Sequence, residues 1–142
     1  MSIRRRCPGC GAQNRVPARH LADVGRCGAC KGQLPALHEP LDVGALEFDS
    51  VQKEAVVPVL VDFWAGWCGP CRTAAPHVAE LAREMAGRAV VLKVDTEAQP
   101  ELAERFDVRS IPTFLVLRGG KPVLRKSGVA PAREMRRWLE SA

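Results

Sequence analysis

Two cysteines separated by two residues, Cys68 and Cys71, fall where an apolar run meets a helical pattern. Residues 59–64 are apolar except for Asp62 and predict a buried strand, and residues 78–85 carry apolar side chains at helical spacing. The pair is therefore expected on the first turn of a helix. Two Cα atoms three residues apart on such a turn are close enough for a disulfide.

A helix N-terminus favours a negatively charged sulfur, because its N–H groups are unpaired and its dipole is positive. Pro70 suits the first turn, since it has no N–H to leave unused. Only a thiolate attacks a disulfide, so this position favours dithiol/disulfide exchange. The alternative is half of a metal site. It is disfavoured because His77 is the only other ligand type nearby and four cysteines stand upstream.

The four upstream cysteines follow the spacing C-x2-C-x16-C-x2-C, which is typical of a zinc site. Four thiolates close a tetrahedral shell, so we expect one structural zinc ion per chain, held by Cys7, Cys10, Cys27 and Cys30. The pattern resembles a zinc ribbon with short strands near residues 13–16 and 32–34. Two redox-active pairs, formed under oxidation, are the alternative.

The excess charge belongs to the N-terminal part of the chain. The formal net charge is +5, and residues 1–40 hold seven basic and two acidic side chains, whereas residues 41–142 hold 14 of each sign. The Arg4–Arg6 run is compatible with nucleic-acid binding or with a solvated basic tail. Residues 1–47 contain no Phe, Trp or Tyr to stack on bases, which favours the tail and argues against nucleic acid.

We expect a protein of the reducing cytoplasm. The sequence has six cysteines, it contains no apolar run of membrane-spanning length, and no apolar segment follows the basic N-terminus. Residues 34–40 contain two prolines and predict a short, stiff linker. We thus expect a zinc module with its linker over residues 1–40 and a second domain over 41–142. A module of about 40 residues needs the metal to fold, whereas one of about 100 residues can bury its own core.

The second domain alternates strands and helices and ends in a hairpin. This order predicts an α/β fold with a mixed sheet and helices on both faces. We expect an edge strand over 41–43 and buried strands over 59–64 and 89–95. The hairpin spans 113–118 and 122–127. Helices are expected over 46–53, from Cys68 through a kink at Pro76 to a stop at Gly87, over 101–106, and from Pro131 with Met135, Trp138 and Leu139 facing inward.

Residues 61–71, VDFWAGWCGPC, resemble the active-site signature of the thioredoxin family. Further matches lie at residues 93–95, 110–113 and 127–129, so the resemblance spans about residues 41–142. It implies the thioredoxin fold, a central mixed β-sheet flanked by helices, preceded here by the zinc-ribbon-like module. The combination is similar to the two-domain, zinc-containing bacterial thioredoxins, the thioredoxin 2 type.

The resemblance implies that Cys68 attacks and Cys71 resolves. Asp62 is a lone acid in an apolar strand, and burial would raise its pKa and let it exchange a proton with Cys71. A carboxylate paired with Lys93 on the next strand is the alternative reading of Asp62, and both can hold. Family members have a residue that matches Lys93, which we assign a supporting role.

The resemblance also implies a cis Ile111–Pro112 bond facing the CxxC, with a backbone edge where an extended substrate pairs. The expected substrate-binding residues are Trp67, Gly69, Pro70, Ile111, Pro112 and Gly128. Trp67 is placed on the rim of the site, with Trp64 partly in the core.

These features predict a cytosolic protein-disulfide reductase. It has no bound organic cofactor, and its electrons come from NADPH through a thioredoxin reductase. Its substrates are disulfide-containing proteins, and we expect a monomer that binds no membrane. Two alternatives remain: a zinc-coupled redox sensor or holdase, and an adaptor that binds nucleic acid or protein through the basic ribbon.

Overall fold

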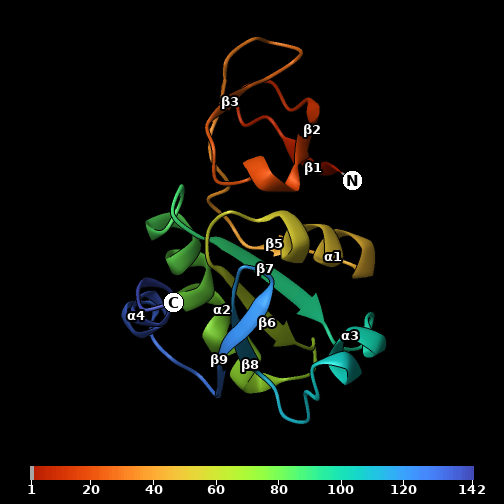
Figure 1. Cartoon of the computed structure of the whole chain (residues 1–142), viewed down its shortest axis with the longest axis vertical. Helices are drawn as coiled ribbons and strands as arrows, with labels where there is room; N and C mark the ends of the chain where they lie inside the picture. Colours follow the sequence, from red (N-terminus) through yellow and green to blue (C-terminus); the bar gives the residue numbers. More distant parts are fainter. Residues whose placement is uncertain (1) are drawn as a thin grey trace.

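The computed structural model describes residues 2–142. Two small hairpins form the N-terminal module at the top of Figure 1. β1 (Ser2–Arg6) pairs antiparallel with β2 (Gln13–Pro17), and β3 (Gly25–Arg26) pairs antiparallel with β4 (Gln33–Leu34). A 3-10 helix, η1 (Ala18–His20), follows β2. The strands expected near residues 13–16 and 32–34 are therefore present.

The basic run at Arg4–Arg6 is part of β1, so the prediction of a solvated tail is wrong. Strand alternation turns Ile3 and Arg5 inward, and they are only 1% and 6% exposed. A guanidinium N–H of Arg5 donates a 2.5 Å hydrogen bond to the carbonyl oxygen of Pro35. This bond allows the charged group to be buried.

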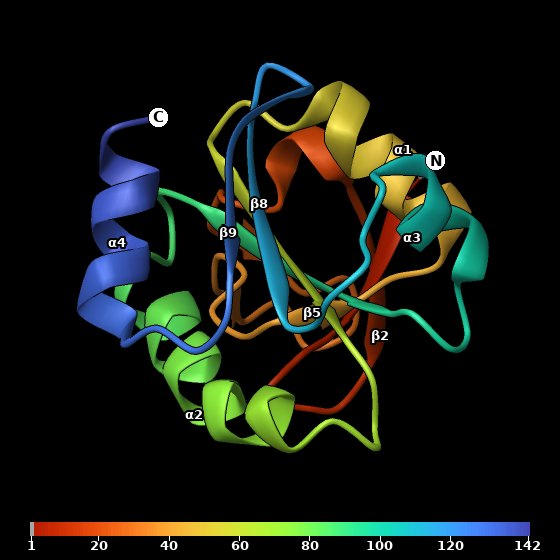
Figure 2. The same ribbon diagram turned by 90° about the horizontal axis from the view of Figure 1, so that it is seen from below.

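The second domain contains a five-stranded mixed sheet in the order β5-β7-β6-β8-β9. Figure 2 shows β8 and β9 side by side. β5, β7 and β6 run parallel, and β8 and β9 are antiparallel to their neighbours. The strands are β5 (Leu41–Asp42), β6 (Val59–Trp64), β7 (Val90–Asp95), β8 (Thr113–Arg118) and β9 (Lys121–Ser127). The central strands are buried on both faces, which explains their continuous apolar runs.

Helices cover both faces of this sheet, as predicted. α1 (Ala45–Glu54) and α3 (Pro100–Arg105) lie on one face, and α2 (Gly69–Glu84) and α4 (Ala132–Glu140) on the other (Figures 1 and 2). An apolar core lies on each face of the sheet, and the side chains of β6 alternate between the two. The odd-numbered residues of β6 pack towards α1, and Leu60 packs towards α2 and α4.

The helix boundaries follow their sequence signals. α2 continues through Pro76, and Gly87 lies shortly after its end with a φ of +84°. Met135, Trp138 and Leu139 form the buried face of α4, as expected from their spacing.

The N-terminal module packs against α1 and shares its apolar core. Part of the predicted linker over residues 34–40 is buried, since Ala36 and Leu37 are 7% and 3% exposed. The N–H of Leu37 donates a 2.8 Å hydrogen bond to the carbonyl oxygen of Leu21. One apolar cluster contains residues of both parts: Ile3, Ala18, Leu21 and Leu37 with Phe48 and Val51.

Candidate redox site and four-cysteine cluster

Cys68 and Cys71 are joined by a disulfide at the start of α2, with their Cα atoms 5.3 Å apart. Cys68 is the N-cap of the helix, and its Sγ accepts a 3.1 Å hydrogen bond from the N–H of Cys71. Exposure does not distinguish the two sulfurs, because the residues are 3% and 5% exposed. The N-cap position does, since it gives the sulfur of Cys68 a backbone donor and the positive end of the helix.

The loop before β8 lies against this disulfide. The carbonyl oxygen of Ile111 is 3.7 Å from Sγ of Cys68, and the Ile111–Pro112 bond is cis, as the resemblance implied. The N–H of Gly128 donates a 2.9 Å hydrogen bond to the carbonyl oxygen of Pro112. Gly128 has a φ of +91°, and the space where a side chain would stand is open. The tertiary structure thus brings residues 111, 112 and 128 to the edge of the CxxC.

Trp67 stands on the exposed rim of the site, with 67% of its surface accessible. Gly69 and Pro70 beside it are also exposed. The indole Nε1 of Trp67 donates a 2.7 Å hydrogen bond to Oε1 of Glu97. Sequence reasoning missed Glu97. Its signal was its place just after β7, because the carboxyl ends of parallel strands meet at one edge of the sheet.

Asp62 lies in the strand that leads to the CxxC and is 2% exposed. Its Oδ1 has no hydrogen-bond partner among residues 2–142. Burial raises the pKa of Asp62 to about 7, while Lys93 lowers it and Asp42 raises it. Lys93 is the strand partner of Asp62, but its ammonium lies 4.7 Å from the centre of the Trp64 ring. The carboxyl group can therefore gain or lose a proton near neutral pH.

The four N-terminal cysteines converge, with their Sγ atoms all within 4.8 Å of one another. Cys7 and Cys30 have their sulfurs 3.8 Å apart, and Cys10 and Cys27 have theirs 3.6 Å apart. A tetrahedron with Zn–S bonds of about 2.3 Å has edges of about 3.8 Å. These sulfurs therefore fit a four-thiolate zinc site.

The two halves of this cluster have the same backbone turn. The N–H of Gly11 bonds to the carbonyl oxygen of Cys7 at 2.8 Å, and the N–H of Lys31 bonds to that of Cys27 at 3.0 Å. Both turn residues have positive φ, +79° for Gly11 and +64° for Lys31. The second turn thus places a lysine where the first has a glycine, at some conformational cost.

N–H groups around Cys27 favour its thiolate form. Backbone N–H of Cys30, the side-chain amide of Asn14 and the N–H of Ala29 lower the pKa of Cys27 to about 6. Nδ2 of Asn14 lies 3.5 Å from the sulfur, and Oδ1 accepts the N–H of Gly28 at 2.9 Å. Such donors support thiolate ligands, since a metal binds only the deprotonated sulfur.

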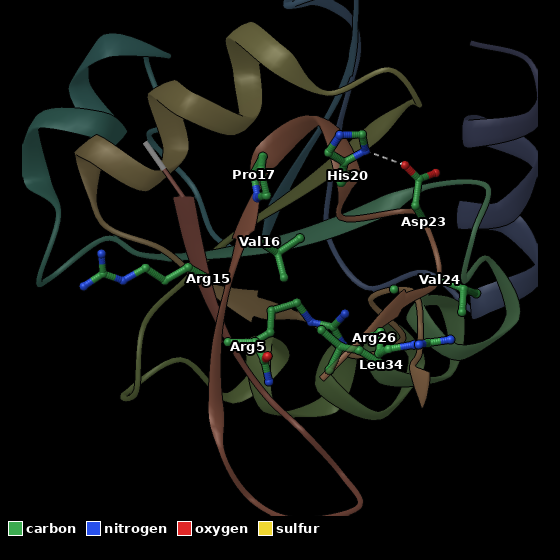
Figure 3. A pocket seen from close by; sticks show the side chains of 11 residues that line it. Arg5, Arg15, Val16, Pro17, His20, Asp23, Val24, Arg26 and Leu34 are labelled. Atoms are coloured by element: carbon green, nitrogen blue, oxygen red, sulfur yellow. Dashed lines mark hydrogen bonds and ion pairs between the residues drawn. The ribbon is translucent and has the colours of Figure 1, made fainter. Parts of the chain in front are cut away.

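A cavity of about 320 Å³ lies between the two hairpins of the module (Figure 3). Nδ1 of His20 and Oδ2 of Asp23 at its edge form a 2.7 Å hydrogen bond. Figure 3 shows Arg15 pointing away from Val16, and Arg5 is bonded to Pro35. The side chains of Arg5 and Arg15 thus point in different directions.

A CxxC at the start of the helix after the central strand, with a cis proline loop beside it, defines the thiol–disulfide oxidoreductases of this fold. The thioredoxin family matches residues 39–141, and this chain belongs to that family. Every helix within residues 2–142 is too short or too polar to cross a membrane.

Relatives agree with this assignment. Thioredoxin C-3 of Corynebacterium nephridii is 42% identical over 134 residues, 94% of this chain and 91% of the relative. Thioredoxin 1 of Nostoc sp. is 45% identical over 96 residues, 65% of this chain and 90% of the relative. A solved structure of a mutant thioredoxin from Halobacterium salinarum has a TM-score of 0.68 at 34% identity, and the match covers 73% of this chain and 90% of the solved one. The first alignment is long enough to enter the N-terminal module, because residues 41–142 supply only 102 positions.

Proposed function

We propose that this thiol–disulfide oxidoreductase reduces disulfides in proteins. The Cys68 thiolate attacks one sulfur of the substrate disulfide and forms a mixed disulfide, and the other substrate sulfur leaves as a thiolate. The Cys71 thiolate then attacks Sγ of Cys68 and releases the second substrate sulfur. The substrate gains two electrons and two protons, which the dithiol loses as it becomes the 68–71 disulfide.

One observation carries the proposal. Sγ of Cys68 receives the N–H of Cys71 and lies 3.7 Å from the backbone carbonyl of Ile111. An activated sulfur thus stands beside a backbone edge on which an extended peptide can align. In this proposal the substrate contacts the backbone edge at Ile111 and Pro112 and the open space at Gly128. It also contacts the exposed rim of the site, formed by Trp67, Gly69 and Pro70.

Asp62 takes the proton of Cys71 during resolution. With a pKa of about 7, the carboxyl group of Asp62 is ionised in only part of the molecules at neutral pH. The ionised form can act as the base that accepts this proton. Lys93, the strand partner of Asp62, supports this role because its positive charge lowers the pKa of the buried carboxyl group.

The N-terminal cysteines Cys7, Cys10, Cys27 and Cys30 hold one zinc ion with a structural role. A shell of four thiolates leaves no position for substrate or water. When bound, zinc cross-links the two hairpins, and Asn14 orients the sulfur of Cys27. We divide the chain at residue 40, with the zinc module over 1–40 and the thioredoxin domain over 41–142.

The oxidised protein is recycled by a thioredoxin reductase at the expense of NADPH, and the protein itself carries no organic cofactor. It works in the cytoplasm, because both the CxxC and the zinc cysteines need an environment that keeps thiols reduced. It works there as a monomer. Its partners are the reductase and disulfide-containing proteins, with no nucleic acid and no membrane.

The test is NADPH-coupled reduction of insulin with a thioredoxin reductase, together with zinc analysis of the reduced protein. We expect turnover by the parent and by a Ser50→Ala control, none by Cys68→Ser, and one zinc per chain. A folded parent that leaves insulin oxidised would overturn the reductase. A zinc content near zero in carefully reduced protein would overturn the metal site.

The sensor or holdase alternative rests on the exposure of Cys10 and Cys30. It predicts that peroxide releases zinc and that the oxidised protein suppresses aggregation of an unfolded client. The adaptor alternative predicts DNA or RNA binding that falls steeply with salt. Either result with an inactive CxxC would replace the reductase proposal.

A further inference from the structure

Three neighbouring strands place a row of charged groups on one face of the sheet. In the strand register Asp42 on β5 is the partner of Lys93 on β7, and Lys93 is the partner of Asp62 on β6. Directly paired residues project to the same face, so the three side chains stand side by side. Along the row the environment changes from exposed at Asp42 through half-buried at Lys93 to buried at Asp62.

The cation in this row is not locked to either acid. The ammonium of Lys93 lies 4.7 Å from the centre of the Trp64 ring. Lys93 and Trp64 line a cavity of about 350 Å³, and Asp42 and Asp95 line it as well. The cavity therefore gives the flexible side chain of Lys93 room to approach Asp42, and the strand pairing places the same side chain beside Asp62.

We propose that Asp42 is a positioning residue for thiol–disulfide exchange: it draws the ammonium of Lys93 towards the cavity and away from Asp62, and so sets the pH range over which Asp62 exchanges its proton. The inference rests on the proposed role of Asp62 in resolving the mixed disulfide. It assigns a function to an acid that belongs to neither the CxxC nor the substrate edge.

The other groups around Asp62 leave Lys93 and Asp42 as the charges that tune it. β8 places Phe114 opposite Asp62, and α2, which covers the same face of the sheet, buries no charged residue: its buried residues are Cys71, Ala74, Val78, Leu81 and Ala82. On β7, Asp95 is held by N–H groups, since its Oδ1 accepts bonds from residues 97 and 98 at 2.9 and 3.4 Å. The pKa of Asp62 is raised first by burial, then lowered by Lys93 and raised by Asp42.

The size of the effect follows from the spacing of the strands. Asp42 and Asp62 are separated by two strand intervals, or about 10 Å. Direct repulsion at that distance raises the pKa of Asp62 by about 0.3 in a water-like medium and by about 1.2 at the lower effective permittivity of a protein, and the displacement of Lys93 adds to that rise.

The first test is a carboxyl-carbon NMR titration of Asp62 in the oxidised full-length protein, where Cys71 does not titrate. Asp42→Asn should lower the midpoint of Asp62 by more than the shift of about 0.3 to 1.2 that direct repulsion accounts for. Asp42→Glu should restore it. Asp49→Asn is the matched control, because it makes the same charge change on α1, at the opposite face of the sheet. Equal midpoints for the Asp42→Asn and Asp49→Asn proteins would overturn the proposal.

A second titration asks whether Asp42 acts through Lys93. In a Lys93→Met background the downward shift caused by Asp42→Asn should fall to less than half its size. An undiminished shift would overturn the proposal, since Asp42 would then act by repulsion alone. With both proteins reduced, the pH midpoint of mixed-disulfide resolution should shift between the parent and the Asp42→Asn protein in the same direction as the NMR midpoint of Asp62. Failure of insulin reduction would refute the proposed function, yet the titration would still report on the row of charges.

Discussion

Sγ of Cys68 lies 3.7 Å from the carbonyl oxygen of Ile111, although the two residues are 43 positions apart in the chain. One belongs to the N-terminus of α2 and the other to the loop that leads into β8. The contact means that a peptide aligned along the Ile111 backbone would present its own sulfur to Cys68. In the proposed function, reaction and recognition therefore meet at one edge of the sheet.

Cys71→Ser should trap substrates. The remaining Cys68 thiolate can still attack, but no second thiol is present to resolve the mixed disulfide. Covalent complexes should accumulate on non-reducing gels and disappear on reduction, and Cys68→Ser should form none. Equal trapping by the Cys68→Ser protein would reverse the assigned roles.

Trp67→Ala should weaken the binding of protein substrates more than that of small disulfides. The exposed indole offers a protein substrate apolar surface and is held by Glu97 at 2.7 Å. We expect KM for insulin to rise about tenfold, equivalent to about 1.4 kcal/mol of binding, with little change for a small aromatic disulfide. Glu97→Ala should act in the same direction but less, with Glu104→Ala as the exposed control. Equal losses on both substrate types would place Trp67 in the chemistry instead.

Asp62→Asn should stabilise the protein at neutral and alkaline pH. The native pKa of about 7 lies above the ordinary value of 3.8, so ionisation of the buried group costs stability as pH rises between these values. Asparagine has no charge and removes this cost. A difference of about 3 between the native and ordinary pKa corresponds to about 4 kcal/mol of unfolding free energy by pH 8. Urea unfolding of the oxidised protein at pH 4 and pH 8 measures it. The gain should be small at pH 4, and a gain independent of pH would contradict the buried titration.

Leu21→Ala should destabilise the whole chain by about 2–5 kcal/mol, because Leu21 is fully buried in the core shared with α1. Leu46→Ala, at a residue that is 70% exposed on α1, is the control and should change stability by less than about 0.5 kcal/mol. Thermal unfolding with zinc present provides the measurement. A truncation that begins at Leu37 should keep reductase chemistry but unfold at a lower temperature, since it uncovers Val51 and its neighbours. Equal melting temperatures would show that the module is energetically independent.

The sequence by itself determined the features that depend on local spacing. The CxxC after a buried strand, the two upstream pairs of cysteines and the alternation of strands with helices were all predictable, because each pattern reflects one turn, one helix or one strand. The family signature supplied the cis bond at Ile111–Pro112, which composition alone does not indicate.

Only the tertiary structure decided the contacts between distant segments. It buried Arg5 against Pro35, packed Leu37 of the linker into the core shared with α1, and brought Glu97 to Trp67. It also placed Asp42 in the row with Lys93. The physical reason is that strand register and helix packing are set by the burial of whole faces, and a short window of sequence does not show which faces will meet.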